Sequence, residues 1–360
     1  MTLETPLSRL QAIGLTPQLL AALSSPLSEG DGHALLRVAE VHRDALVLHD
    51  GRAPLPARAR PALIQALAAE ADALAVGDWV LAEHNRFGEC WVHERLPPRT
   101  QLARRLHDGR DKVERVVLAS NVDTALLVMG LDHDFNLRRL ERYLALVRLA
   151  GISCVVVLSK ADLCADPARR LRDALALAPA GVEVLALNTL ADDARALLAP
   201  WLAPGQTLVL LGSSGAGKST LANALCAAEV AATSGTRRGD GRGRHTTTVR
   251  TLHPLPGGAC LIDTPGLRTL RLDSEAGDVA GAFDDIAALA PMCRFRDCRH
   301  EGEPGCAVRG AVAPERLKSF GKLLREAQRD TMSALERREL VSTWKARQRA
   351  GRANLKAKRG

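Results

Sequence analysis

The chain has 360 residues, of which 46% are hydrophobic and 25% are charged, a composition that indicates globular domains and excludes general disorder. The net charge is +8, but residues 344–360 contain seven Lys and Arg and no acid, which leaves only +1 for the rest of the chain. The charge of this basic tail favours binding to a polyanion, either RNA or an anionic membrane. The alternative is a tail that contacts only solvent. Because aromatic residues make up only 3%, an RNA surface has to depend on Lys and Arg.

The sequence also indicates the cellular compartment of the protein. It contains no apolar run of about 18 residues, as a membrane span needs, and its first ten residues lack the basic-then-apolar pattern of a signal peptide. Five of the eight cysteines are scattered, and three, Cys293, Cys298 and Cys306, are bunched. This usage is typical of a reducing compartment and one metal site. We expect a cytoplasmic, monomeric protein.

The first part of the chain predicts a small β domain. Residues 1–32 form a leader with helical leucine spacing, and residues 33–101 contain short alternating runs broken by turns such as Asp50-Gly51. Short strands with such turns favour a small barrel or sandwich. The Ala-rich stretch 61–75 is compatible with a helix inside that domain.

Residues 102–275 then alternate strands with helices. The predicted strands are 124–128, 152–158, 182–187, 206–211 and 261–262, and the predicted helices are 137–149, 167–177 and 192–201. This alternation predicts an α/β domain with a parallel sheet covered on both faces. Residues 276–330 are predicted as a small helical domain with the cysteine cluster, and 331–360 as a helical and basic tail.

The strongest motif is a phosphate loop between the 206–211 strand and a helix. It fits the pattern G-x-x-x-x-G-K-[ST], in which backbone N–H groups surround phosphate oxygens. Lys218 is predicted to reach the β- and γ-phosphates, as binding and catalytic residue, and Ser219 to hold Mg²⁺. The predicted nucleotide contacts are Gly212, Ser213, Ser214, Gly215, Ala216, Gly217, Lys218, Ser219 and Thr220.

Two further segments suit the γ-phosphate. In the D-T-P-G motif, Asp263 ends an apolar strand and is a candidate for the Mg²⁺ shell, while the N–H of Gly266 can reach the γ-phosphate. The Gly- and Arg-rich loop 237–250 contains three consecutive threonines, 246–248. One of them, with Thr247 as our candidate, is predicted to hold Mg²⁺ when that loop closes.

The segment Ser159-Lys160-Ala161-Asp162 follows the 152–158 strand and resembles the N-K-x-D guanine motif of GTPases. Asp162 can accept hydrogen bonds from guanine N1–H and its 2-amino group, donors that adenine lacks. Lys160 can lay its stem along the base. Ser159 replaces the usual Asn with a shorter side chain, which has less reach toward the neighbouring loop. Asn188-Thr189, after the next strand, is a weak candidate for a contact to guanine O6.

The order of these motifs is unusual, because the base motif precedes the phosphate loop. In ordinary GTPases the phosphate loop comes first. A circular permutation explains the order and still leaves every loop at the carboxyl edge of the strands, where ligands bind.

The bunched cysteines form a second candidate site. Cys293, Cys298, His300 and Cys306 supply three thiolates and one imidazole, which satisfy one tetrahedral structural Zn²⁺ and leave no open position for catalysis. Free thiols and an exposed His are the alternative. Arg294, Arg296, Arg299 and Arg309 surround the cluster, which suits a module that faces phosphates.

With these motifs in this order, the chain resembles the RsgA (YjeQ) family, the circularly permuted GTPases of the small ribosomal subunit. The resemblance covers nearly the whole chain, from the V-G-D-W-V segment of the barrel to the cysteine cluster. It implies an OB-fold barrel, a permuted GTPase domain and a zinc domain. It further implies contact with rRNA and a role in late maturation of the small (30S) subunit, with GTP hydrolysis stimulated by that subunit.

His245 is the predicted catalytic residue. The position after the D-T-P-G motif, where many GTPases carry a Gln, is Leu267, which cannot orient a water. His245 precedes the threonines of the loop expected to close over the γ-phosphate, and its imidazole can bond a water. The family resemblance points the same way. A solvent-facing His, or an RNA contact beside Arg242 and Arg244, is the alternative.

Two other functions remain open from the sequence. One is a GTP-gated RNA-binding assembly factor in which hydrolysis is negligible, and turnover with and without small subunits distinguishes it. The other is a P-loop small-molecule kinase. Asp162, Lys160 and the appended barrel and zinc modules argue against a kinase, which should also prefer ATP.

Overall fold

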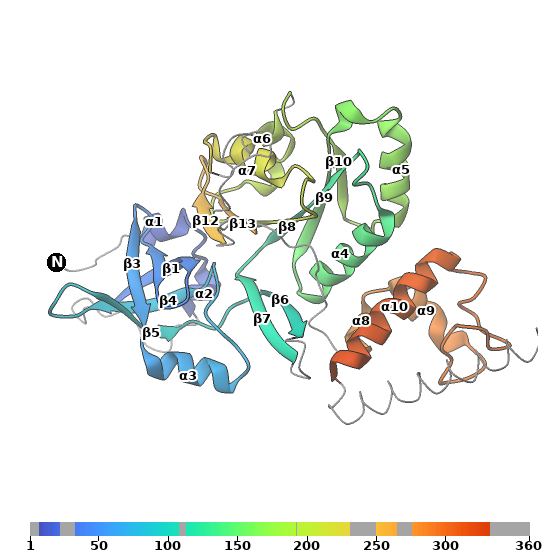
Figure 1. Cartoon of the computed structure of the whole chain (residues 1–360), viewed down its shortest axis with the longest axis horizontal. Coiled ribbons are helices and arrows are strands. Elements are labelled where there is room, and N and C mark those ends of the chain that lie inside the picture. The colour runs from blue at the N-terminus through green and yellow to red at the C-terminus, as the bar shows by residue number, and fades with distance from the viewer. Residues whose placement is uncertain are drawn as a thin grey trace, which may run out of the picture. The chain divides into compact units, whose positions relative to one another are not determined.

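The computed structural model describes residues 7–21, 33–107, 113–191, 193–230, 250–264 and 276–331. The chain divides into two compact units: residues 1–104 with 115–270, and residues 105–114 with 271–360. No helix within the described ranges is long and apolar enough to span a bilayer. Each unit is described by itself (Figure 1).

The first unit begins with a five-stranded barrel that follows two short helices, α1 (Leu7–Gln11) and α2 (Pro17–Ala21). The barrel strands are β1 (His33–Val41), β2 (Leu46–His49), β3 (Pro54–Ala59), β4 (Trp79–His84) and β5 (Cys90–Arg95). β1 pairs with both β2 and β4, and the parallel β3–β5 pair closes the ring. The predicted small barrel is confirmed, in the five-stranded Greek-key form of an OB-fold.

Along each strand, apolar side chains at every second position point into the barrel, which explains why this segment forms a barrel. Leu36, Val38, Val80 and Val92 are fully buried in its core. The helix α3 (Pro61–Ala69) connects β3 to β4, and it is shorter than the predicted stretch 61–75. It ends there because Ala71 adopts a left-handed backbone, with φ +54°, which cannot continue an α-helix.

The barrel joins the following domain through a buried contact that involves the V-G-D-W-V segment. A Cβ at Gly77 would lie 2.1 Å from the carbonyl oxygen of Ser120, so only glycine permits this approach. The Arg37 guanidinium is fully buried and donates to the carbonyl oxygens of Gly77, Asn121 and Ile13. These bonds connect the leader, the barrel and the α/β domain at one point.

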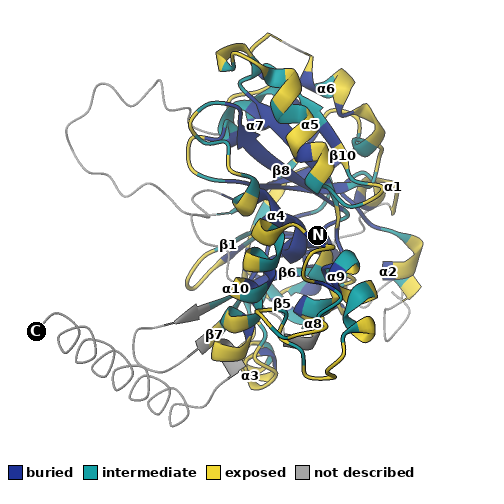
Figure 2. Cartoon of the chain, turned by 90° about the vertical axis from the view of Figure 1, so that its right-hand side faces the viewer, coloured by how far each residue is buried: buried dark blue, intermediate teal, exposed yellow. Residues whose placement is uncertain are grey.

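The α/β domain is built on a sheet with the order β10-β9-β8-β11-β13-β12, which continues into the barrel through β1. Its strands are β8 (Thr124–Gly130), β9 (Ser153–Ser159), β10 (Glu183–Ala186), β11 (Thr207–Leu211), β12 (Thr251–Pro254) and β13 (Cys260–Asp263). The β10–β9, β9–β8, β8–β11 and β11–β13 pairs are parallel, and β12 is antiparallel to β13. The predicted parallel sheet is confirmed, and the interior strands are buried (Figure 2).

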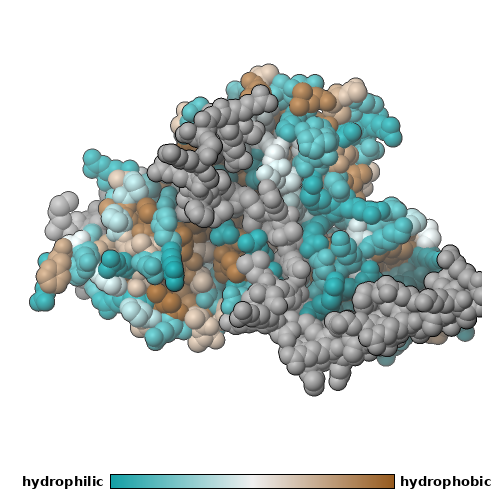
Figure 3. Space-filling model, viewed as in Figure 1, coloured by the Kyte–Doolittle hydropathy of each residue, from teal (hydrophilic) through white to brown (hydrophobic). Residues whose placement is uncertain are grey.

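The helices of this domain are α4 (Leu137–Leu149), α5 (Pro167–Leu177), α6 (Ala194–Leu197) and α7 (Lys218–Cys226). α4 and α5 have the predicted limits. The predicted helix 192–201 is instead α6 followed by a 3₁₀ turn, η2 (Ala199–Trp201), because Pro200 lacks the N–H that an α-helix needs at that place. In the space-filling view, hydrophilic side chains predominate over α4, while hydrophobic ones are interspersed over the barrel (Figure 3).

Three strands outside the barrel were not predicted. β6 (Gln101–His107) and β7 (Val113–Ser120), which follow the barrel in the sequence and precede the α/β domain, form a separate two-stranded sheet. β12 was missed as well, and its Thr251 pairs with Glu40 of β1, so that barrel and α/β domain share one continuous sheet.

The second unit is helical. It contains α8 (Ala276–Gly281), α9 (Asp284–Leu289), the 3₁₀ turn η4 (Ala290–Met292) and α10 (Pro314–Thr331). Its small core includes Val279, Phe283 and Ile286, and Phe283 meets Phe320 of α10 edge-on at 5.3 Å between ring centroids. The basic tail 344–360 lies outside the described residues.

Candidate nucleotide site and metal centre

The predicted phosphate loop connects β11 to α7, as the motif requires. Gly217 precedes α7 with a left-handed backbone, φ +91°. A Cβ at Gly212 would lie 2.2 Å from the carbonyl oxygen of Val128 in β8. The glycines therefore allow the loop to turn tightly and to rest on the neighbouring strand. N–H groups at the start of such a helix are suited to bind an anion.

Lys218 and Asp263 lie at the carboxyl edge of the sheet. Lys218 is 7% exposed, and its Nζ donates to the carbonyl oxygens of Gly212 at 3.0 Å and Ser213 at 2.7 Å. Burial lowers the pKa of Lys218, and Asp263 opposes that shift. Burial likewise raises the pKa of Asp263 against the charge of Lys218. The ammonium and carboxylate are thus near each other and poorly solvated, which suits phosphate and a hard cation.

The segment that carries Asp263 is tied to the phosphate-loop strand. Thr264 is fully buried, and its hydroxyl donates to the carbonyl oxygen of Leu210 in β11. Ser219 and Thr220 lie in the first turn of α7 and are half-buried. Oxygen donors from α7 and from the end of β13 are the groups on this edge that would hold Mg²⁺.

Ser159 behaves differently from the sequence-based expectation. Despite its short side chain, it reaches the phosphate loop: its Oγ donates to the carbonyl oxygen of Ala216 at 2.6 Å. This contact is possible because Ser159 ends β9 fully buried, and a Cβ at Gly217 would lie 3.3 Å from its Oγ. The phosphate loop comes close enough to β9 for a serine side chain to form this hydrogen bond. The base motif and the phosphate loop are therefore directly connected.

The rest of the base motif follows β9 in a tight turn. Lys160 adopts a left-handed backbone, with φ +57°, and Ala161 and Asp162 lie in the 3₁₀ turn η1 (Ala161–Leu163). Asp162 is exposed. The N–H of Ala161 donates to the carbonyl oxygen of Leu187 at 3.4 Å, so the Asn188-Thr189 loop lies beside the base motif.

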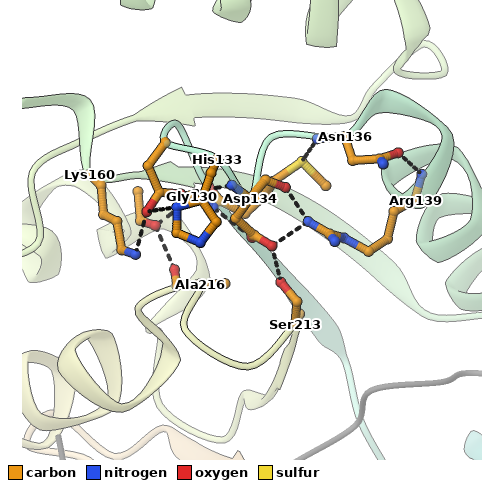
Figure 4. Close-up of polar contacts among 12 residues, drawn as sticks. Gly130, His133, Asp134, Asn136, Arg139, Lys160, Ser213 and Ala216 are labelled. Carbon is orange, nitrogen blue, oxygen red and sulfur yellow. Dashed lines mark hydrogen bonds and ion pairs between the residues drawn. The ribbon is translucent and has the colours of Figure 1, made fainter. Parts of the chain in front are cut away.

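One set of contacts at this edge was missed by the sequence analysis. Lys160 Nζ lies 2.8 Å from Asp132 Oδ2, and the Ser213 hydroxyl donates to Asp134 Oδ1 at 2.6 Å (Figure 4). Both aspartates belong to the loop between β8 and α4. Polar residues directly after a buried parallel strand were the available signal, because all such strand ends meet at one edge.

The structure does not place every predicted site residue. His245, Thr247 and Gly266 lie outside the described residues, as does most of the Gly- and Arg-rich loop. Their roles stay predictions.

The predicted metal ligands of the second unit come together. The ligand atoms of Cys293, Cys298, His300 and Cys306 all lie within 4.8 Å of one another, and in the part of the chain that the structure describes this is the one group of His, Cys, Asp and Glu close enough to hold a metal ion. The His300 Nδ1 lies 3.6 Å from Cys293 Sγ and 3.4 Å from Cys306 Sγ. Left-handed backbones at His300 and Gly305 make this turn possible.

The chemistry of the cluster fits a thiophilic cation. Burial opposes ionisation of Cys293, but hydrogen bonds from the N–H groups of Ala307 and Val308 and from the neighbouring thiols together lower the pKa of that thiol. Burial and the neighbouring thiols raise the pKa of Cys298 to about 11. Cys298 is thus a neutral thiol unless a cation neutralises the charge of the cluster, and Cys₃His is a common set for tetrahedral Zn²⁺.

Comparison with known proteins indicates the family of this chain. Residues 96–273 match the family model "RsgA GTPase". The chain is 46% identical over 297 residues to the small ribosomal subunit biogenesis GTPase RsgA of Xanthomonas oryzae pv. oryzae (strain PXO99A), covering 80% of this chain and 79% of that protein. It is 43% identical over 293 residues to the protein of the same name from Xylella fastidiosa (strain 9a5c), covering 80% and 84%.

The chain belongs to the RsgA family of GTPases.

Solved structures agree with the fold. YjeQ from Thermotoga maritima is similar with a TM-score of 0.60 at 21% identity, covering 82% of this chain and 99% of that one. YloQ, described as a circularly permuted GTPase, has a TM-score of 0.57 at 21% identity, covering 86% and 99%. The permuted motif order in this RsgA-family chain therefore corresponds to a known arrangement of the GTPase sheet.

Proposed function

We propose that this RsgA-family chain binds the small ribosomal subunit and its rRNA in the cytoplasm, late in maturation of that subunit, and hydrolyses GTP to GDP and phosphate under its stimulation. The relatives that carry the name of a small ribosomal subunit biogenesis GTPase support the biological role. The observation that carries the chemistry is the direct bond from Ser159 to Ala216, which joins a guanine-type motif to a phosphate loop in one site.

In this proposal the parts of the site have separate roles. Asp162 selects guanine, and Lys160 lies along the base. Lys218 and the N–H groups of the phosphate loop bind the phosphates, while Ser219, Thr247 and Asp263 are the residues that would hold Mg²⁺. That ion would neutralise charge that develops on the phosphates. His245 orients the attacking water, Gly266 contacts the γ-phosphate, and Cys293, Cys298, His300 and Cys306 hold one structural Zn²⁺.

A turnover assay tests the proposal. Purified chain is incubated with GTP and Mg²⁺, alone and with purified small subunits, and phosphate release is measured. We expect slow release alone and a rise of at least tenfold with small subunits. Large subunits serve as the control and should give no rise.

Other outcomes would point to the alternative functions. Tight GTP binding with no phosphate release on the small subunit would indicate a GTP-gated assembly factor. Preference for ATP in a competition panel of nucleotides would indicate a kinase. Either result would contradict the proposed GTPase activity.

A further inference from the structure

The loop that connects β8 to α4, residues 131–136, contacts both halves of the nucleotide site. Its shape is set locally. The carboxylate of Asp132 accepts from the backbone N–H of Asp134 at 3.0 Å, and Asp134 accepts from the N–H of Gly130 at 3.2 Å. A Cβ at Gly130 would lie 2.6 Å from Asp132 Oδ1. The loop thus holds two carboxylates in fixed positions beside the end of β8.

Asp134 faces the phosphate loop. Its Oδ1 accepts from the Ser213 hydroxyl at 2.6 Å and from Arg139 Nη2 at 2.5 Å (Figure 4). The side chain of Asp134 is only 10% exposed, so these bonds are protected from solvent competition. Arg139, in the first turns of α4, also donates to the backbone carbonyl of Asp134. Its charge neutralises a carboxylate that would otherwise repel a bound phosphate.

Asp132 faces the base motif. Its Oδ2 lies 2.8 Å from Lys160 Nζ, with side-chain exposures of 13% and 27%. Burial opposes ionisation of Asp132, but the bonds from Lys160 and the Asp134 N–H outweigh it and lower its pKa. Arg170 of α5 donates to the Asp132 carbonyl at 3.2 Å and lies 4.8 Å over the ring of Phe135. The loop is therefore anchored on this side too.

From these contacts we propose that Asp132 and Asp134 are positioning residues for the nucleotide, with Asp134 holding the phosphate loop through Ser213 and Asp132 holding Lys160 along the base. The inference rests on the proposed function, because it assigns roles toward a guanine nucleotide. Ser213 and Lys160 follow different strands, β11 and β9. A loop that binds both fixes the distance between the phosphate and base subsites before the nucleotide arrives, which lowers the ordering cost of binding.

A mutant cycle tests the contact to the phosphate loop. Asp134→Ala, Ser213→Ala and the double variant are compared with the wild type by GDP titration. We expect each single change to weaken GDP binding about tenfold, which is about 1.4 kcal/mol. The double variant should lose no more than Asp134→Ala alone, because Asp134→Ala already removes the bond to the Ser213 hydroxyl. Ser213→Thr keeps a hydroxyl and should restore near-wild-type affinity.

A second variant tests the contact to the base motif. Asp132→Asn should weaken GDP and XDP binding by the same factor, about threefold to tenfold, because the Lys160 stem lies along either base. The preference for GDP over XDP should stay unchanged. Asp173→Asn removes an exposed carboxylate of α5 and serves as the matched control, with unchanged affinity.

The results separate this inference from the proposed function. Changes below twofold in Ser213→Ala and Asp132→Asn, or additive losses in the cycle, would overturn the positioning role while the wild type still binds GDP. Ser213→Ala removes only one hydroxyl from a half-buried loop residue. Its GDP affinity therefore tests the role of the Asp134–Ser213 contact even if Asp134→Ala does not fold. A wild-type chain that binds no guanine nucleotide would overturn the proposed function itself.

Discussion

The Cys₃His cluster and the nucleotide site differ in how far apart their residues lie in the sequence. The cluster takes all four ligand groups from the segment Cys293–Cys306. The nucleotide site takes its residues from the ends of β8, β9, β11 and β13, which span the chain from Gly130 to Asp263. A local site can be recognised from spacing alone. A site assembled by a sheet can be recognised only where a motif marks a strand end, and its cross-strand contacts stay hidden.

This comparison predicts that a substitution in one site leaves ligand binding at the other site unchanged. The largest expected effect is the loss of the metal. Cys298→Ser removes one of four ligands and should abolish stoichiometric zinc, expected at about one ion per chain. Zinc contributes on the order of 10 kcal/mol to the folding of small modules, so the second unit should lose structure and small-subunit binding. GDP affinity should stay at the wild-type value. Elemental analysis and GDP titration check both halves, and a wild-type chain free of zinc would refute the metal assignment.

Asp162→Asn should give the next largest effect. The amide offers a donor where the carboxylate accepted, so guanine loses a partner and xanthine gains one. Sites built to hydrogen-bond a substrate group discriminate by about 10⁴-fold, and we expect a change in the GDP-to-XDP preference of at least 10²-fold. Competition binding with both nucleotides measures it. Zinc content is the control and should not change, while unaltered guanine selectivity would contradict the role of Asp162.

His245→Ala tests the residue predicted to orient water. GTP affinity should stay nearly constant, and turnover on the small subunit should fall about 10²-fold or more, the usual scale for a positioned proton-transfer group. Lys218→Ala provides the contrast, because it should weaken nucleotide binding itself. Single-turnover kinetics with saturating GTP distinguish the two. Wild-type turnover in the His245 variant would mean that a group of the ribosome orients the water.

Deletion of residues 344–360 should have the smallest effect. It removes seven positive charges, and the affinity for the small subunit should fall about tenfold at low salt. The slope of affinity against salt concentration should flatten in proportion to the number of rRNA phosphates that the tail neutralises. Nucleotide affinity and zinc content should not change. An identical salt slope in both proteins would show that the tail is a solvated end.

Local signals explain which parts of the fold were predictable. α4 and α5 have the predicted limits because Asn136 and Asp166 cap them, each accepting from a backbone N–H three residues later, and Pro167 starts the second helix. β12 and the β6–β7 hairpin lack such signals. Pairing between Glu40 and Thr251 depends on how the barrel meets the sheet, and no local pattern encodes that register.

The sequence by itself determined the chemistry of this protein: a phosphate loop, a guanine-type motif in permuted order and a Cys₃His set, because each depends on residue types at short fixed spacings. Only the tertiary structure showed that Ser159, despite its short side chain, reaches the phosphate loop, since the Ala216 carbonyl comes within 2.6 Å of its hydroxyl. Only the structure brought Asp132 to Lys160 and Asp134 to Ser213. These contacts join residues far apart in the chain, and the order of strands in the sheet, which no spacing reveals, sets their distances.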